Sequence, residues 1–342
     1  MATRAQPDVP RPLVALREVG RDFDVSKPWL NRMVERAPRQ LLRAVDGFSL
    51  QVRSGETLAL VGESGCGKST VARLIVGLYP PSRGHIEFDG EPQAASTAAI
   101  WSAEVRRRMQ MIFQDPYASL NPRWRVMDIV AEPIRSHGLA TRRDDLRSRV
   151  VDLLLQVGLA AADCQKYPHE FSGGQRQRIS IARALSSAPE FLVCDEPTSA
   201  LDVSVQAQIL NLMKELQDKL GLTYLFISHN LAVVSQMASR VGVMYLGRLV
   251  ELANAHALFS RPRHPYSRML LDAIPDLDMS GRPRTPVAGE VANPLDPPSG
   301  CAFHTRCPFA NQRCRIERPE LKADTLGSLV ACHAVEEGRT AA

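Results

Sequence analysis

The stretch TLALVGESGCGKSTVARLIVGL, residues 57–78, decides the fold of this 342-residue chain. Its first five residues, 57–61, form a short and mostly apolar run that predicts a buried strand, and residues 68–78 have the amphipathic pattern of a helix. The segment that joins strand to helix fits the pattern G-x-x-x-x-G-K-[ST]. It consists of Gly62, Glu63, Ser64, Gly65, Cys66, Gly67, Lys68, Ser69 and Thr70.

This pattern predicts a phosphate-binding loop. Its glycines let backbone N–H groups surround phosphate oxygens, and the helix that follows directs its positive end at them. Lys68 supplies a point charge for the β- and γ-phosphates, and the Ser69 hydroxyl can bind Mg²⁺. The alternative is a Gly-rich turn with a chance Lys-Ser pair, which the strand before it and the helix after it disfavour. ATP and Mg²⁺ are the ligands that we expect.

Two further strand ends offer polar groups for the same chemistry. The run FLVCDE, residues 191–196, predicts a buried strand that ends at Asp195, which can hold Mg²⁺ through water, and Glu196, which can deprotonate an attacking water. Acidic residues at strand ends are common, so this pair alone is weak evidence for a metal site. The phosphate loop in the same domain makes that interpretation stronger. His229 follows the strand-like run TYLFI. A lone histidine is more often structural, but ligands gather at the carboxyl ends of strands in open α/β sheets. We therefore expect His229 near the γ-phosphate.

A second anion-binding helix start is predicted at Ser172, Gly173 and Gly174. Ser followed by two glycines makes a helix cap, and an ordinary cap is the simpler interpretation. The glycines also expose backbone donors at the positive end of the helix. Two helix ends of one small domain cannot easily enclose one nucleotide. The pattern therefore favours a dimer in which the cap of one chain covers the nucleotide of the other.

Six short motifs follow one another in a characteristic order. They are GESGCGKST at 62–70, FQD at 113–115, FSGGQ at 171–175, FLVCDE at 191–196, SALD at 199–202 and ISHN at 227–230. With this order the chain resembles the ATPase subunits of ABC transporters over roughly residues 13–255. The resemblance implies an α/β fold of the P-loop NTPase class.

The resemblance also implies a role for each matched residue. Phe23 would stack on adenine, with an ordinary core or surface phenylalanine as the alternative. At the metal, Gln114 would link the ion to a membrane partner and Asp195 would be the metal carboxylate. For hydrolysis, Glu196 would be the general base and His229 the switch histidine. Across the dimer, Asp202 would be a contact between the two sites, and the signature would consist of Ser172, Gly173, Gly174 and Gln175.

The composition of the chain changes once, near residue 261. We therefore predict an ATPase domain over residues 1–260 and a small Cys-rich C-terminal module over residues 261–342. By resemblance, residues from about 115 to 188 form a helical subdomain that contacts the membrane subunits. The role of an insertion at 26–42 stays open.

Four segments narrow the resemblance to one group of transporters. DPYASLNPR at 115–123, YPHEFSGGQRQRI at 167–179, RHPYSRMLL at 263–271 and PPSGCAFHTRCPFA at 297–310 resemble the ATPase subunits of bacterial oligopeptide, dipeptide and nickel importers. This implies ATP-driven import of peptides with two membrane permease subunits, an extracytoplasmic solute-binding protein and a second ATPase chain. For that pair we favour a heterodimer at the cytoplasmic face of the cell membrane.

Other functions remain as alternatives. The same machinery could import nickel or another small solute. A soluble ABC ATPase that acts on nucleic acid or ribosomes is disfavoured, because the chain has one ATPase domain and no heptad stretch. A metal- or redox-sensing module regulated by ATP is disfavoured by the intact hydrolytic residues.

Composition excludes further classes. No apolar run approaches the ~20 residues of a membrane-spanning helix, and prolines near the N-terminus argue against a signal peptide. The net charge of +5 is a mild excess, so nucleic acid is not an expected partner. We expect a cytosolic protein, whose cysteines are reduced or bound to metal.

Four cysteines near the C-terminus, Cys301, Cys307, Cys314 and Cys332, lie among polar and Pro-rich segments. They could be ordinary buried thiols, but four thiolates can also hold zinc or a [4Fe–4S] cluster that folds the segment. The spacing lacks the C-x₂-C pairs common to both kinds of site, and His304 or His333 could replace one thiolate in a zinc site. The resemblance favours the [4Fe–4S] cluster, with Zn²⁺ as the second choice.

Overall fold

A computed structural model describes residues 11–35, 38–93, 100–140, 142–273, 289–290, 292–325 and 327–340. The first ten residues, where the sequence predicts no signal peptide, lie outside the described residues. So do residues 274–288, the first part of the segment rich in Pro and Gly.

The main sheet is built around parallel strands. Its described strands lie in the order β11-β12-β10-β9-β3-β8-β7-β6, and β6, β7, β8, β3 and β9 run parallel to one another, whereas β10 pairs antiparallel with β9. Every residue of β3, β7 and β8 is buried, as expected for parallel strands covered on both faces. The strands are β3 (Thr57–Val61), β6 (Met109–Ile112), β7 (Phe191–Asp195), β8 (Thr223–Ile227), β9 (Arg240–Tyr245), β10 (Arg248–Asn254), β11 (Lys322–Ala323) and β12 (Leu329–Val330). This is the α/β fold that the sequence predicts.

A smaller antiparallel sheet packs beside it, with its strands in the order β2-β1-β4-β5. Its strands are β1 (Val14–Asp24), β2 (Leu41–Val52), β4 (Arg83–Phe88) and β5 (Glu91–Pro92). Phe48 and Ile86 of this sheet share one apolar cluster with Leu74 of α2 (Lys68–Ile75), the helix after the phosphate loop. The core of the small sheet is therefore continuous with the core around that loop.

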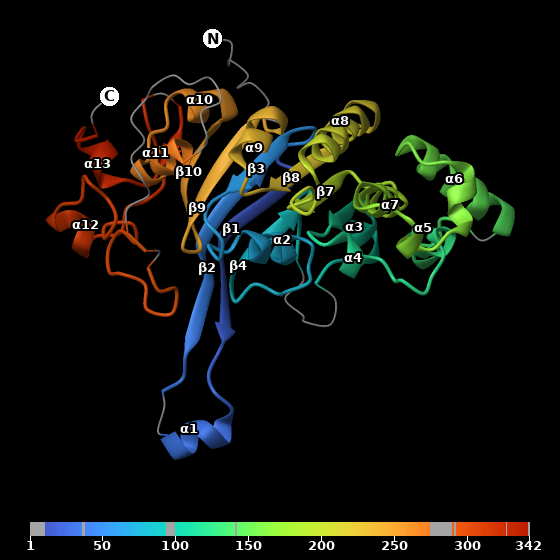
Figure 1. The fold of residues 1–342 in the computed structure, drawn as a ribbon. Helices are drawn as coiled ribbons and strands as arrows, with labels where there is room; N and C mark the ends of the chain where they lie inside the picture. The colour runs from blue at the N-terminus through green and yellow to red at the C-terminus, as the bar shows by residue number, and fades with distance from the viewer. Residues whose placement is uncertain are drawn as a thin grey trace, which may run out of the picture.

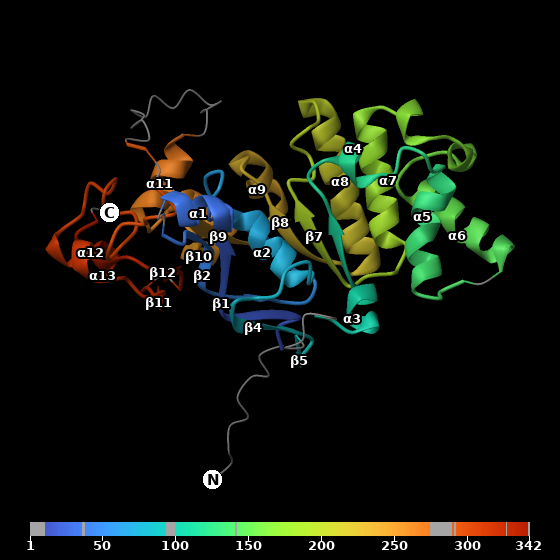
Figure 2. The ribbon, with the colours of Figure 1, turned by 90° about the horizontal axis from the view of Figure 1, so that it is seen from below.

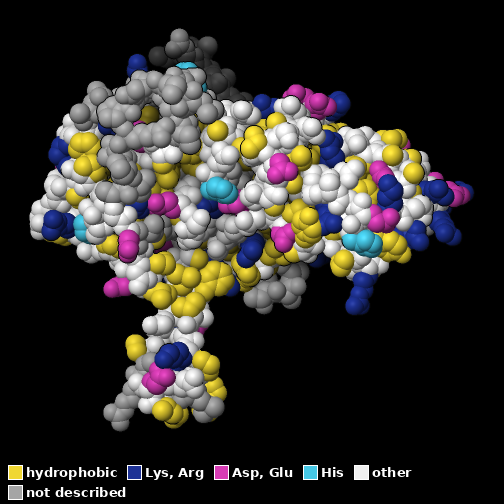
Figure 3. All heavy atoms as spheres, in the orientation of Figure 1, with side chains coloured by type: hydrophobic (Ala, Val, Ile, Leu, Met, Phe, Trp, Pro, Cys, Tyr) yellow, Lys and Arg dark blue, Asp and Glu magenta, His cyan; other side chains and the backbone are white. Residues whose placement is uncertain are grey.

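Strands β1 and β2 extend beyond the small sheet as an arm that carries α1 (Trp29–Glu35) at its tip (Figure 1). The arm contains the 26–42 insertion that the sequence singles out, of which residues 36 and 37 lie outside the described part. Trp29, Met33 and Val34 expose 69%, 75% and 86% of their surface. Hydrophobic side chains gather at the tip and again where the arm joins the body (Figure 3).

Among the described residues between 115 and 188, the regular elements are all helices. They are α4 (Pro116–Ser119), α5 (Val126–Ser136), α6 (Arg143–Gln156), η1 (Ala161–Gln165), η2 (Pro168–Glu170) and α7 (Gly173–Leu185). Ile129, Val150 and Ile179 join α5, α6 and α7 in one apolar cluster. Both ribbon views place α5 and α6 at the end of the molecule opposite α12 and α13 (Figures 1 and 2). Outside this range lie α3 (Ala103–Arg108), α8 (Val203–Leu220) and α9 (Leu231–Met237).

The C-terminal segment packs on the main sheet and, in its described part, has only a small apolar cluster of its own, formed by Val330, Cys332 and Ala334. Strand β12 pairs with β10 through Glu251 with Val330 and Leu252 with Leu329, so the main sheet continues into the predicted module. Phe303 packs against Tyr245 of β9, with ring centroids 5.4 Å apart. The sequence predicts a separate module, whereas in the structure this segment packs on the ATPase domain. A segment so poor in large apolar side chains is stable only when it packs against a larger core. Its helices are α11 (Pro265–Asp272), α12 (Gln312–Ile316) and α13 (His333–Glu336), and α10 (Ala255–Ser260) comes just before it.

Two buried titratable groups join α11 to the sheet. The Glu251 carboxylate accepts hydrogen bonds from the backbone N–H groups of Arg263 and His264, at 2.9 and 2.8 Å. His264 caps α11, because its Nδ1 accepts a hydrogen bond of 3.0 Å from the N–H of Tyr266. Burial lowers the pKa of His264 from 6.5 to about 3. The imidazole is therefore neutral in the folded chain at physiological pH.

We predict that His264 makes the fold sensitive to acid. Below pH 6.5 the unfolded chain takes up a proton at His264, and the folded chain does not until about pH 3. Over that window the free energy of unfolding should fall by up to about 1.4 kcal/mol per pH unit because of this one group. His264→Asn keeps a capping acceptor and cannot titrate, so its stability should fall less steeply in urea unfolding between pH 7 and 5. His256→Asn, at an exposed position of α10, is the control with an unchanged slope. Parallel curves for His264→Asn and wild type would show that the prediction is wrong.

Candidate functional site

The loop between β3 and α2 is pressed against two other backbone segments. Gly62 and Gly67 have φ angles of +152° and +105°, which side chains of L-residues rarely adopt. A Cβ atom on Gly62 would lie 2.2 Å from the carbonyl oxygen of Met244, and one on Gly67 would lie 2.3 Å from that of Ala44. The fold therefore demands glycine at both positions, and the loop is fixed between the end of β9 and β2.

The Lys68 side chain folds back over this loop. Its ammonium donates hydrogen bonds to the carbonyl oxygens of Gly62 and Glu63, at 2.7 and 2.9 Å. Lys68 is only 6% exposed, so the charge is held at the loop and not in solvent. Phosphate oxygens arriving at the loop can take over these hydrogen bonds. The arrangement fits a loop already shaped for phosphate.

Ser69 and Asp195 offer a place for a divalent cation. The Ser69 hydroxyl donates a hydrogen bond of 2.9 Å to Oδ1 of Asp195, which joins the start of α2 to the end of β7. Burial raises the pKa of Asp195, and this hydrogen bond opposes the effect. A buried carboxylate beside a hydroxyl is a donor set that suits Mg²⁺, which binds oxygen ligands and would offset the buried charge.

Glu196 is the meeting point of three strand ends. Its Oε2 accepts a hydrogen bond from Nε2 of Gln114 and contacts Nδ1 of His229, both at 3.1 Å. Gln114 follows β6, Glu196 follows β7 and His229 follows β8. Glu196 itself has a φ of +49°, an uncommon backbone for a residue other than glycine. The structure thus brings the three polar candidates of the sequence analysis together at one edge of the sheet.

A cavity of about 1190 Å³ opens beside the phosphate loop. Phe23 lines it, half-buried, edge-on to Tyr79 with ring centroids 5.4 Å apart and under the guanidinium of Arg21. Such a wall suits an adenine ring. The cavity is also lined by Ser64, Gly65, Gly67, Lys68, Ser69, Thr70, Gln114 and Glu196.

The predicted second anion site lies elsewhere on the chain. Ser172 caps α7 in a reciprocal arrangement, in which its Oγ accepts from the Gln175 N–H and Oε1 of Gln175 accepts from the Ser172 N–H, at 3.4 and 3.0 Å. Gly174 is packed so tightly that a Cβ would lie 2.4 Å from Cγ1 of Val205. Asp202 is exposed at the start of α8. Neither the signature nor Asp202 is among the described residues that line the cavity, so one chain by itself does not bring them to the phosphate loop.

The structure adds two residues that the sequence analysis missed. Arg306 contacts the Glu63 side chain, and the hydroxyl of Tyr266 contacts the Glu63 backbone. Both residues lie in segments that the sequence singles out only as resemblances, RHPYSRMLL and PPSGCAFHTRCPFA. No spacing rule connects positions 243 residues apart, so nothing in the sequence signals this contact.

The four C-terminal cysteines lie near one another. The Cys301 N–H donates a hydrogen bond of 2.8 Å to the carbonyl oxygen of Cys314. Burial, together with the neighbouring thiols of Cys332, Cys314 and Cys307, raises the pKa of Cys301 to about 12. Still, in the part of the chain that the structure describes, no three His, Cys, Asp or Glu side chains are arranged to hold a metal ion.

Comparison with known proteins agrees with this geometry. Residues 45–199 match the family model described as ABC transporter, and residues 250–314 match the one described as oligopeptide/dipeptide transporter, C-terminal region. The chain is 47% identical over 324 residues to the oligopeptide transport ATP-binding protein AppF of Bacillus subtilis, covering 94% of this chain and 97% of that protein. It is 46% identical over 326 residues to the di/tripeptide transport ATP-binding protein DppF of Pseudomonas aeruginosa, covering 95% and 98%.

The chain belongs to the family of oligopeptide/dipeptide transport ATP-binding proteins. Its ABC ATPase fold matches the dimeric, post-hydrolysis structure of the ATP-binding cassette MJ0796 bound to ADP and Pi, with a TM-score of 0.60 and 26% identity. That match covers 71% of this chain and 98% of the cassette. The expected family and its ATPase activity are thereby confirmed. Within the described residues, no helix of this ATPase has the length and apolar character needed to cross a membrane.

We predict that Glu196→Gln nearly abolishes ATP turnover by the assembled transporter and leaves ATP binding intact. The amide keeps the contact with Gln114 but cannot accept a proton, and general-base assistance is typically worth ~10²–10⁴-fold. Lys68→Ala should instead weaken nucleotide binding, since it removes the charge at the loop. Initial rates of phosphate release and equilibrium binding of fluorescent ATP measure the two effects separately. Near-normal turnover by Glu196→Gln would contradict the role given to Glu196.

Proposed function

We propose that this chain hydrolyses ATP at the cytoplasmic face of the cell membrane to power the import of peptides through a membrane permease. One observation carries the proposal: the groups for phosphate, Mg²⁺ and water chemistry converge on one cavity in a chain whose C-terminal region matches peptide transporters. The named relatives transport oligopeptides and di- or tripeptides. Import of nickel or another small solute by the same machinery is the second candidate.

The proposed complex contains two ATPase chains, two permease subunits and an extracytoplasmic solute-binding protein. A second ATPase chain is needed because the capped start of α7 lies away from the cavity of its own chain. A nucleotide on the phosphate loop would then be covered by Ser172–Gly174 of the other chain, with Asp202 near the contact between the two sites. The helices between 115 and 188 would receive the cytoplasmic loops of the permease, and Gln114 would link those helices to the metal. We favour a heterodimer of two related ATPase chains.

We predict that the complex purified with its co-encoded partners contains two different ATPase chains and takes up labelled peptide when reconstituted in vesicles. Adding the peptide-loaded binding protein should raise ATP hydrolysis, because closure of the ATPase pair is coupled to the permease. Glu196→Gln in this chain should suppress uptake.

The outcomes separate the candidates. A complex that takes up Ni²⁺ and no peptide would overturn the peptide proposal and keep the importer. Copurification of one kind of ATPase chain in an active complex would overturn the heterodimer. Activity without any membrane partner would favour the soluble class of ABC ATPases.

We also propose that Cys301, Cys307, Cys314 and Cys332 hold a structural [4Fe–4S] cluster, with Zn²⁺ as the second choice. Four neighbouring thiols, two of them buried and two half-buried, are a donor set that suits either, although their present arrangement is not that of a formed site. Binding would draw the thiolates together and fix the segment, because metal binding and folding are coupled. The cluster has no step in the ATPase reaction.

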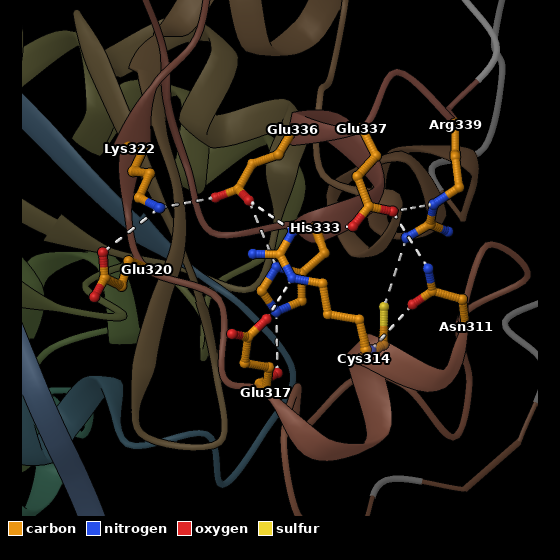
Figure 4. Close-up of polar contacts among 10 residues, drawn as sticks. Asn311, Cys314, Glu317, Glu320, Lys322, His333, Glu336, Glu337 and Arg339 are labelled. Atoms are coloured by element: carbon orange, nitrogen blue, oxygen red, sulfur yellow. Dashed lines mark hydrogen bonds and ion pairs between the residues drawn. The ribbon is translucent and has the colours of Figure 1, made fainter.

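A network of polar contacts holds the chain end that carries two of these cysteines (Figure 4). The Asn311 side chain accepts a hydrogen bond of 3.1 Å from the Cys314 N–H, and Nη2 of Arg339 lies 3.8 Å from Sγ of Cys314. Nε2 of His333 contacts the carbonyl oxygen of Glu317 at 3.0 Å. The other ring nitrogen of His333, Nδ1, is buried without a hydrogen-bond partner among the described residues and lies 3.6 Å from a carboxylate oxygen of Glu336.

We predict that anaerobically purified protein is brown and contains iron and acid-labile sulfide. Cys→Ser at any of the four positions should bleach it, because each replaces one thiolate. Cys164→Ser is the control matched to Cys314 and Cys332: Cys164 is buried as they are but lies in the helical part of the chain, so its loss should leave the colour unchanged. Colourless protein with stoichiometric zinc would reject the cluster and keep a metal site. Absence of any metal would reject both.

A further inference from the structure

The C-terminal segment contacts the phosphate loop at one residue, Glu63. Both terminal nitrogens of Arg306 donate to the Glu63 carboxylate, Nη1 at 2.9 Å and Nη2 at 3.0 Å. The Glu63 backbone N–H donates a hydrogen bond of 2.9 Å to the hydroxyl of Tyr266 in α11. Side chain and backbone of the second loop residue are therefore both fixed from outside the loop.

The contact between Arg306 and Glu63 lies in the protein core and not at the surface. The Arg306 side chain is only 2% exposed. Its guanidinium lies over the rings of Tyr245 and Phe303, and the ring of Tyr266 packs 4.7 Å from that of Tyr245. Breaking this ion pair would leave the buried guanidinium without a counter-charge, which costs much free energy. The arginine therefore stays bound to its carboxylate. Glu63 is accordingly bound firmly in its present position.

Glu63 also takes part in holding the phosphate lysine. Its carbonyl oxygen accepts one of the two backbone hydrogen bonds from Lys68, at 2.9 Å. The peptide group whose N–H Tyr266 holds also carries the carbonyl oxygen of Gly62, which accepts the other hydrogen bond from Lys68, at 2.7 Å. Without the contacts from Arg306 and Tyr266, Glu63 can rotate. The backbone of the phosphate loop must then become ordered each time a nucleotide binds. Ordering of this kind lowers affinity, whereas a loop held ready avoids it.

We propose that the C-terminal segment is a working part of the nucleotide site, in which Arg306 and Tyr266 are positioning residues that hold the phosphate loop ready for ATP. ATP affinity then depends on the fold of the C-terminal segment, although none of its side chains needs to touch the phosphates. The inference rests on the proposed function, because it takes ATP as the nucleotide. It gives the C-terminal segment a role in ATP binding in addition to its place in the sheet.

The test is a double-mutant cycle on ATP binding by the full chain, read by titration with a fluorescent ATP analogue and Mg²⁺. Arg306→Gln and Glu63→Gln should each raise the Kd by about tenfold, and the double variant should be no weaker than the single ones, because both remove the same contact. For Arg306→Gln in the assembled transporter, the KM for ATP should rise by a larger factor than kcat falls, since loop ordering enters binding and not the chemical step.

Two further variants keep the test decisive. Tyr266→Phe removes only the hydroxyl that receives the Glu63 N–H, so it should fold normally and still raise the Kd. Arg313→Gln removes another arginine of the same segment, one that pairs with Glu317 and Glu337 and not with the loop, and should leave the Kd unchanged. An unchanged Kd for folded Arg306→Gln, or for Tyr266→Phe if Arg306→Gln does not fold, would overturn the inference. If Lys68→Ala still weakens binding in that case, the proposed ATPase function stands without it.

Discussion

The close approach of the phosphate loop to two neighbouring backbones is the constraint on which the site depends. Only glycine can occupy positions 62 and 67, because any side chain would run into the carbonyl oxygen of Met244 or Ala44. Fixed in this way, the loop starts α2 at the carboxyl edge of the parallel strands. The other polar groups reach the same edge because β6, β7 and β8 end there.

Burial then sets the chemistry of the charged groups. Lys68 is held by backbone carbonyls and is thus kept at the loop in the absence of phosphate. Asp195 has its pKa raised by burial, so a cation next to it favours the ionised carboxylate. Glu196 lies between Gln114 and His229, which both contact the same oxygen of its carboxylate. With Arg306 bound to Glu63, the C-terminal segment extends this network beyond the ATPase core.

The sequence predicted the parts of the molecule that short and continuous patterns determine. The strands that end at Asp195 and before His229 follow from apolar runs, whereas the role of Gln114 was implied by the family resemblance alone. The continuation of the main sheet into β12 could not be predicted, because a two-residue strand has no periodicity. The pairing of Arg306 with Glu63 was equally beyond reach, since it depends on how α11 and the cysteine segment pack around Tyr245. The cluster of cysteines stands out in the sequence, but its spacing alone does not distinguish a zinc site, an iron–sulfur site and ordinary buried thiols.

The most direct test of the central claim, that the loop is already shaped for phosphate, is an experimental structure of the full chain with Mg²⁺ and a non-hydrolysable ATP analogue. The account predicts that the backbone of the loop keeps its present shape and that Arg306 stays on Glu63. Lys68 should exchange the carbonyl oxygens of Gly62 and Glu63 for phosphate oxygens, and the Ser69 hydroxyl should bind the Mg²⁺. A nucleotide bound away from this loop, or a loop that rebuilds its backbone around the phosphates, would contradict the account.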